Sequence, residues 1–328
     1  METKAFFADL LNRYDLGELI DDPVMLPETF LYESCRLSTS SGNYVVKLIE
    51  KSVFKEESVL KFLEKESRIY DLFCKAGVCA VYPIAYDGRK MLEIDGRYFY
   101  LTEWFDGLPL GIDDVTGFHC EKAAEQLARI HNIDLKETNR TYIPLKIDFD
   151  HYAKQCADEK LPISELLYDY LDLIKETLCR GNQAAKSIPS IHSLCHNDYD
   201  LKNVLWNNEQ FRIIDLEAVD YSNPYQEIVN SALAWSGGDD FCFNEKLFYT
   251  YLSTYFKNSR LDPKINWADV FDSNTSRHAW LEHNLKNALR HGISKEEKET
   301  AVFQINKAIN RIVYSKKIRE KALNLIRC

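Results

Sequence analysis

Hydrophobic and polar residues change their periodicity along the chain. Residues 43–49 and 98–107 are short runs rich in Val, Ile, Tyr and Phe, which predict buried strands. Residues 56–75 instead repeat apolar positions at spacings of four and three, which predicts an amphipathic helix with a stripe of Val59, Leu63, Tyr70 and Phe73. Helical patterns dominate farther on, as at residues 120–133 and 228–235. Strands followed mostly by helices indicate an α+β fold.

Three more apolar runs predict strands in the second half of the chain. A loop follows the first of them, and the other two form a hairpin. The runs are residues 193–195, 203–206 and 211–214. The turn at residues 207–210 contains two asparagines, which tolerate the positive φ of tight turns. Such a hairpin would carry Asp215 back beside the loop that precedes it.

That loop carries the most informative residues of the sequence. From His196 to Asn203 it reads HNDYDLKN, and the hairpin ends in IIDLE, which closes at Glu217. Phosphoryl transfer requires one carboxylate that accepts the proton of the attacking hydroxyl, and a carboxamide and a second carboxylate that hold magnesium. Asp198, Asn203 and Asp215 fit these three roles. In the alternative interpretation, Asp198 only forms a turn and Asp215 only ends a strand.

The pattern HxDxxxxN followed by IDxE, with NPYQEI beginning at Asn223, resembles the aminoglycoside phosphotransferase and choline kinase superfamily. The resemblance implies a bilobal protein-kinase-like fold: an N-lobe with an antiparallel sheet and one helix over residues 1–102, a hinge at 103–107, and a larger, mainly helical C-lobe over 108–328. It also implies that the hinge backbone binds the nucleotide base, here through Glu103, Trp104 and Phe105. Without the other motifs, the same segment would be a plain edge strand.

Two charged residues interrupt apolar patterns in the predicted N-lobe. Lys47 lies inside the strand at residues 43–49, and Glu66 occupies a position of the apolar helix stripe. A buried charge is costly without a partner, so each residue supplies what the other lacks. This is the lysine and glutamate pair that holds the α- and β-phosphates in kinase-like folds. Alternatively, Lys47 snorkels to solvent and Glu66 is exposed at the edge of the stripe.

The resemblance implies further roles around the catalytic loop. His196 would brace the loop, Lys202 is a further catalytic candidate, and Glu217 would support a second metal or orient the site. Glu227 stands where many relatives have an aspartate that ties down the loop. His131 ends a helical LARIH segment and is interpreted as a hydrogen-bonded structural residue.

The implied cofactors are ATP, or GTP, and Mg²⁺. Protein kinases cover the phosphates with a glycine-rich hairpin, but residues 26–31 contain no glycine here, which leaves Thr29 or backbone amides to approach the phosphates. The choice between ATP and GTP therefore stays open. Protein kinases also have a lysine two residues after the catalytic aspartate. This chain has Asp200 there, which argues for a small alcohol as acceptor.

Composition limits the partners and the compartment. The 328 residues carry a formal charge of −10 with a pI near 5.4, which argues against nucleic acid or an anionic membrane as partner. No apolar stretch approaches the roughly 20 residues that span a bilayer, and the start lacks signal-peptide features, so we expect a cytoplasmic protein. The nine cysteines form no CxxC pair and predict reduced thiols. Zinc at His192, Cys195 and His196 is disfavoured because this stretch is predicted as strand and loop.

The charge is unevenly distributed. Residues 103–250 contain 26 acidic and 13 basic residues, a net of −13, whereas residues 251–328 have a net of +7. The acidic segment, with aromatic residues such as Tyr199, Tyr225 and Trp235, suggests a cationic hydroxylated acceptor, although a solvated acidic surface explains the same count. We therefore predict a small-molecule kinase, acting on an aminoglycoside, an amino alcohol such as choline, or a sugar. The alternatives are a protein kinase and a non-catalytic nucleotide-binding module. The oligomeric state is not predicted.

Overall fold

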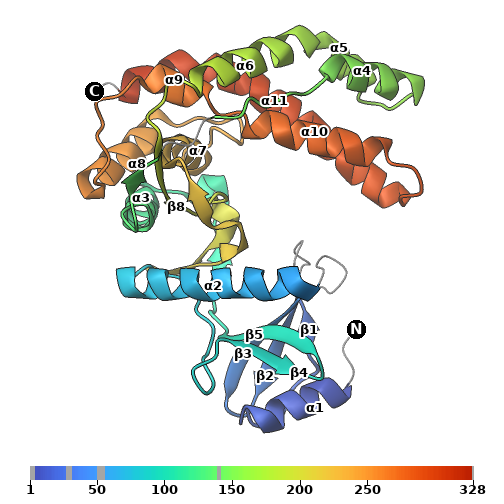
Figure 1. Ribbon diagram of the computed structural model, residues 1–328, viewed down its shortest axis with the longest axis vertical. Helices are drawn as coiled ribbons and strands as arrows, with labels where there is room; N and C mark the ends of the chain where they lie inside the picture. The colour runs from blue at the N-terminus through green and yellow to red at the C-terminus, as the bar shows by residue number, and fades with distance from the viewer. Residues whose placement is uncertain (1–3, 27–31, 50–55, 139–141, 327–328) are drawn as a thin grey trace. The chain divides into compact units, whose positions relative to one another are not determined.

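The computed structural model describes residues 4–26, 32–49, 56–138 and 142–326. The chain divides into two compact units (Figure 1). Unit 1 comprises Met1–Leu110 and Lys202–Val219, and unit 2 comprises Gly111–Leu201 and Asp220–Cys328. Each unit has its own sheets and its own hydrophobic core.

Unit 1 is built on a five-stranded antiparallel sheet in the order β1-β2-β3-β5-β4. The strands are β1 Val24–Met25, β2 Tyr32–Thr39, β3 Gly42–Ile49, β4 Met91–Ile94 and β5 Arg97–Glu103, and the helices are α1 Lys4–Arg13 and α2 Glu56–Ala76. The predicted strand at 43–49 and helix at 56–75 are confirmed. In the predicted stripe, Tyr70 and Phe73 are buried, whereas the side chains of Val59 and Leu63 lie outside the described residues.

The two faces of this sheet have different neighbours (Figure 1). Phe6 and Leu10 of α1 share a hydrophobic core with Val46 of β3 and with Phe99 of β5. Successive side chains of a strand point to opposite faces. Lys47 and its cross-strand partner Tyr100 therefore face the other way, toward α2, where Tyr100 meets the ring of Tyr70 with 5.7 Å between centroids.

A hairpin from the second half of the chain also belongs to unit 1. It consists of β9 Val204–Asn207 and β10 Gln210–Ile213, and β9 pairs with β6 Leu108–Pro109. Asn208 in its two-residue loop has a φ of 54°, so the predicted hairpin and its asparagine turn are confirmed. Ile213 is bonded through its backbone to Cys79 and Val81. The sequence prediction assigned residues 108–328 to one lobe. In the structure, these contacts group Lys202–Val219 with the N-terminal segment.

Unit 2 is mainly helical. A small sheet in the order β11-β8-β7 consists of β7 Lys136–Glu137, β8 Ile191–Cys195 and β11 Asp220–Ser222. The helices are α3 Gly117–His131, α4 Phe149–Asp158, α5 Ser164–Asp169, α6 Leu171–Ala184, α7 Pro224–Trp235, α8 Glu245–Asn258, α9 Trp267–Asp272, α10 Ser276–Leu289 and α11 Lys295–Ile326. One core joins α4, α5, α6, α10 and α11. Among the described helices, none combines the length and the apolar character that a bilayer crossing needs.

Candidate active site

Lys47 and Asp215 form an ion pair within unit 1. The Nζ atom of Lys47 lies 3.6 Å from a carboxylate oxygen of Asp215, and the side chains are 22% and 24% exposed. The alternation of β3 turns Lys47 away from the α1 core, and the end of the β9–β10 hairpin supplies Asp215. Two charges that the sequence places 168 positions apart therefore meet at one partly accessible point.

Local backbone geometry holds Asp215 beside Asn203. The N–H of Ile214, one residue before Asp215, donates to the carbonyl oxygen of Asn203 at 2.9 Å. Asp215 itself has a left-handed conformation, with φ 61° and ψ 55°, which ends the strand abruptly and starts a short 3-10 helix at Leu216. Asn203 is buried. The sequence prediction that the hairpin brings these two residues together is confirmed.

Three carboxylates of unit 1 gather around Tyr70. Burial raises the pKa of Tyr70 well above its usual value, and the neighbouring charges of Glu66, Glu217 and Asp215 raise it further. Glu66 is only 4% exposed, so its predicted place on the buried helix stripe is confirmed and the exposed alternative is wrong. The pairing of Glu66 with Lys47 stays a prediction.

Sequence reasoning placed Tyr70 on the helix stripe and Tyr100 in a strand, but it did not connect them with this cluster. Burial raises the pKa of Tyr100 and the charge of Glu66 raises it further, which places Glu66 next to the residue that pairs with Lys47 across the sheet. The spacing of Tyr70, four residues after Glu66 and on the same helix face, was a signal that could have found it.

The donor set of this cluster fits a hard divalent cation. Mg²⁺ prefers oxygen ligands, and carboxylates of Asp215 and Glu217 with the carboxamide of Asn203 supply them within one unit. The carboxylates around Tyr70 outnumber Lys47, so the cluster is negative. A site with this charge balance suits a divalent cation.

The predicted hinge residues continue β5 out of the sheet. The N–H of Trp104 donates to the carbonyl of Asn43 at 2.9 Å. In an antiparallel ladder the neighbouring residue, Glu103, then directs its backbone groups away from β3. The carbonyl of Phe105 accepts a bond from the N–H of Gly107. The Glu103 carbonyl and the Phe105 amide are therefore the backbone groups best placed for a nucleotide base, and this role stays a prediction.

In unit 2, Glu227 ties down the loop that carries Asp198. One carboxylate oxygen of Glu227 accepts from the backbone N–H of His196 at 3.0 Å, and the other accepts from the N–H of Asn197. Asn197 has a φ of 64°, so the chain turns sharply just before Asp198, which is half-buried. The longer glutamate side chain therefore ties down the loop, which is the role that the resemblance gives to an aspartate at this position.

A buried histidine, His131, also bonds Glu227. We call Glu227, His131 and Tyr255 the Glu227 brace. The Nε2 atom of His131 lies 2.7 Å from Glu227 Oε2, and Nδ1 lies 2.6 Å from the hydroxyl oxygen of Tyr255. Burial alone would raise the pKa of Glu227, but His131, His196 and the Asn197 amide outweigh it and lower that pKa below its usual value. The prediction that His131 is a hydrogen-bonded structural residue is confirmed, and only the structure identified its partners.

Three residues of types that often bind metals lie close together at this brace. Ligand atoms of His131, Cys195 and Glu227 lie within 4.8 Å of one another. Both histidine nitrogens and both carboxylate oxygens already make hydrogen bonds, and burial raises the pKa of the Cys195 thiol well above its usual value. A thiol that resists deprotonation is a poor metal ligand. The cluster is therefore a hydrogen-bonded brace.

Several predicted residues lie elsewhere. Tyr199, Tyr225 and Trp235 are buried in unit 2, where other aromatic rings pack against them, so the expectation that they offer a face to a cationic substrate is wrong. Lys202 is exposed in the 3-10 helix Leu201–Asn203, and its catalytic role stays a prediction. Thr29 lies outside the described residues.

Comparisons with known proteins identify the family of this chain. The sequence matches the model of a family described as the phosphotransferase enzyme family over residues 31–262. Among curated protein sequences, none matches this chain.

Solved structures show the same fold at low identity. A spectinomycin phosphotransferase in complex with ADP and spectinomycin is 12% identical, with a TM-score of 0.67 over 94% of this chain and 98% of that one. A microcompartment-associated aminopropanol kinase is 14% identical, with a TM-score of 0.59 over 97% and 98% of the two chains. The ethanolamine kinase of Plasmodium vivax is 15% identical, with a TM-score of 0.57 over 93% and 82%.

Proposed function

Because this chain belongs to the phosphotransferase enzyme family, we propose that it transfers the γ-phosphate of ATP to a hydroxyl group of a small molecule, with Mg²⁺ as cofactor. The family membership confirms the predicted phosphotransferase, and the solved structures confirm the kinase-like α+β fold. ATP, the metal and the acceptor class are the parts that we propose.

The observation that carries the proposal is the meeting of Lys47, Asn203 and Asp215 within unit 1. In the proposed mechanism Lys47 holds the phosphates, and Glu66 keeps Lys47 in position. Asn203 and Asp215 would hold Mg²⁺, with Glu217 beside them. There it would supply positive charge that offsets the charge on the transferring phosphoryl group. The backbone of Glu103 and Phe105 binds the base.

Asp198 would act as the general base. Because Glu227 fixes the two preceding backbone amides, the position of Asp198 is set by the loop itself. The γ-phosphoryl group passes through a loose transition state, so orienting the hydroxyl contributes more than strong basicity. Asp198 accepts the hydroxyl proton as the oxygen bonds to phosphorus and the bond to the leaving oxygen breaks.

The acceptor would be a small molecule that carries an amino group. The net charge of −13 over residues 103–250 attracts cations. The solved structures of similar fold include enzymes named for spectinomycin, aminopropanol and ethanolamine. The aromatic residues no longer support this choice, since they are core. An aminoglycoside or a short amino alcohol is the acceptor that the remaining observations favour.

The decisive experiment compares two aspartates of one loop. Asp198→Asn should lower kcat by about 10²- to 10⁴-fold, the usual contribution of general base catalysis, while ATP affinity changes little. Asp200→Asn removes the same charge two residues later and serves as the matched control. Activity is measured as ADP release across aminoglycosides, amino alcohols and sugars. Near-normal turnover by the Asp198 variant would contradict the assignment of Asp198 as the general base.

The metal is tested by calorimetry. ATP binding should weaken when Mg²⁺ is removed, and Asp215→Ala should abolish that dependence, because Asp215 supplies a metal ligand. If neither change affects binding, the metal site lies elsewhere.

The charge of the acceptor is tested by comparative kinetics. Amino alcohols or aminoglycosides should have a higher kcat/KM than neutral sugars, and this advantage should fall with added salt because the attraction is electrostatic. Preference for neutral sugars without salt dependence would contradict the cationic acceptor.

A further inference from the structure

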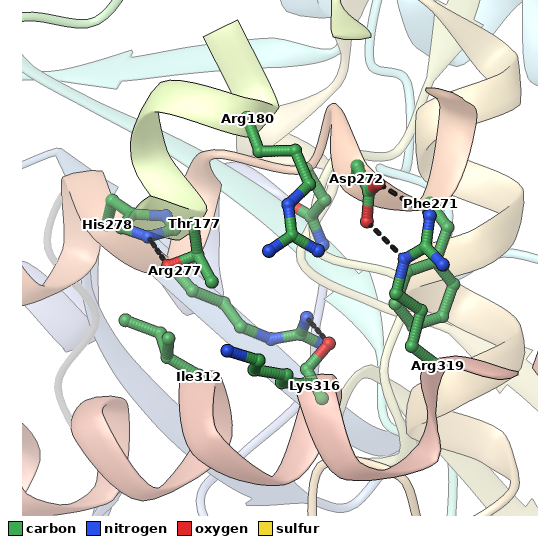
Figure 2. Close-up of a pocket in the computed structure, with 11 residues that line it drawn as sticks. Thr177, Arg180, Phe271, Asp272, Arg277, His278, Ile312, Lys316 and Arg319 are labelled. Carbon is green, nitrogen blue, oxygen red and sulfur yellow. Dashed lines mark hydrogen bonds and ion pairs between the residues drawn. The ribbon is translucent and has the colours of Figure 1, made fainter. Parts of the chain in front are cut away.

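A basic cavity of about 50 Å³ opens among helices α6, α9, α10 and α11 of unit 2 (Figure 2). None of the residues that line it has been assigned a role in phosphoryl transfer. Its cationic lining residues are Arg180, Arg277, Lys316 and Arg319, and Asp272 is an acid beside them. We propose that this cavity binds a phosphate ion or the phosphoryl group of a small phosphorylated molecule.

Arg319 forms a fixed wall of the cavity. Its Nε and Nη2 atoms each donate to a different carboxylate oxygen of Asp272 at 2.7 Å (Figure 2). Both side chains are largely buried. This two-point pair occupies the negative charge of Asp272, so Asp272 does little to repel an anion from the remaining space.

Arg180 and Lys316 are engaged more loosely than Arg319. Figure 2 shows the guanidinium group of Arg180 pointing into the cavity toward that of Arg277. Arg180 and Lys316 both pair with Glu176, whose side chain is 53% exposed. Exposed ion pairs contribute only about 0–1 kcal/mol, so an entering anion displaces Glu176 at small cost.

The charges that face this space favour an anion. Arg277 donates to Asp239 at 2.8 Å and to the Ser315 hydroxyl at 3.2 Å. Asp239 is also close to Arg311 and Lys307, whose positive charges, with that of Arg277, lower its pKa despite its burial. Residues 251–328 as a whole have a net charge of +7. Like charges that converge on a partly buried space are stabilised by an anion between them.

The N–H donors of the cavity and its volume suit a tetrahedral oxyanion. Guanidinium groups present paired N–H donors that match phosphate oxygens. One water needs about 10–15 Å³, so a cavity of about 50 Å³ has room for a phosphoryl group.

Thermal unfolding of the full chain tests the proposal with inorganic phosphate, at constant ionic strength against chloride. The unfolding midpoint should rise with phosphate concentration, because a ligand that binds the folded state stabilises it. Arg180→Gln with Lys316→Gln should weaken phosphate binding at least about tenfold, through loss of two charge-assisted contacts. Lys317→Gln is the matched control, since it removes a charge from the next position of α11 but does not line the cavity.

A catalytic-site variant separates this cavity from the phosphate site of the enzyme. Lys47→Ala should keep the phosphate effect. If Lys47→Ala loses the effect and the double variant keeps it, the ion binds at the catalytic centre and the proposal is wrong. Absence of any phosphate effect overturns it as well. Glycerol phosphate then identifies the source: tighter binding than phosphate indicates a phosphorylated metabolite, and binding of phosphate alone indicates the free ion.

Discussion

Lys47 with Asp215 in unit 1 and His131 with Glu227 in unit 2 are two polar pairs that differ in distance, burial and further contacts. Lys47 and Asp215 in unit 1 are 3.6 Å apart and about a quarter exposed. His131 and Glu227 in unit 2 are 2.7 Å apart and nearly fully buried, at 0% and 6% exposure. Glu227 also accepts two backbone N–H bonds, whereas Asp215 lies among carboxylates that repel it.

In the proposed mechanism this difference separates a pair used for chemistry from a structural pair. A partly exposed pair such as Lys47 and Asp215 can exchange partners when a metal and phosphates bind. A buried pair with every acceptor occupied holds one geometry, because leaving any of its groups unpaired costs several kcal/mol. Unit 1 therefore holds the pair that we propose for chemistry, and unit 2 holds a pair that stabilises a loop.

The largest expected effect is on activity, in unit 1. Lys47→Ala should lower kcat/KM about 10³-fold, which corresponds to about 4 kcal/mol of transition-state stabilisation. The free energy of unfolding should change by less than about 1 kcal/mol, since the pair is partly exposed. Steady-state kinetics and urea unfolding measure the two quantities. A stability loss as large as the activity loss would remove the distinction between the pairs.

The second effect is on stability, in unit 2. Glu227→Ala should lower the free energy of unfolding by about 3 kcal/mol, because His131 and two backbone amides lose a buried acceptor. Glu125→Gln, which breaks an exposed pair with Lys122, is the control and should cost at most about 0.5 kcal/mol. Equal urea midpoints for the two variants would contradict the structural role of Glu227.

A smaller loss of stability is expected at Tyr255, the second hydrogen-bond partner of His131. Tyr255→Phe removes the hydroxyl group that bonds His131 Nδ1 and leaves the ring in place. The expected loss is about 1–1.5 kcal/mol of unfolding free energy, the usual value for one hydrogen bond. The double variant with Glu227→Ala should lose less than the sum of the single losses, because both act on His131. Strict additivity would show that the network does not act as a unit.

The smallest effect is a pH dependence. The folded pKa of Glu227 lies below its ordinary value of 4.5, so its contribution to stability is fully present above pH 4.5 and is lost as pH falls through the folded value. The measured quantity is the difference in unfolding free energy between wild type and Glu227→Gln. Below pH 4.5 this difference should shrink. A difference that grows as the pH falls below 4.5 would reverse the inferred direction.

The comparison also explains what sequence reasoning found easily. Asn203 and Asp215 are close in sequence, and a two-residue hairpin leaves few ways to arrange them. Glu66 was recognisable because a carboxylate on an apolar helix stripe conflicts with its surroundings. Local patterns of period two and period 3.6 carried these predictions, as they carried the strand at Gly42–Ile49 and the helix at Glu56–Ala76.

The sequence by itself determined the family motif, the α+β class and the candidate residues for phosphoryl transfer. Only the tertiary structure decided that Tyr255 and His131 complete the Glu227 brace, that Tyr199 and Trp235 are core, and that four helices bring cations to one cavity. The reason is physical. Burial and contacts between residues a hundred positions apart depend on how helices pack, and neither propensity nor spacing along the chain encodes that packing.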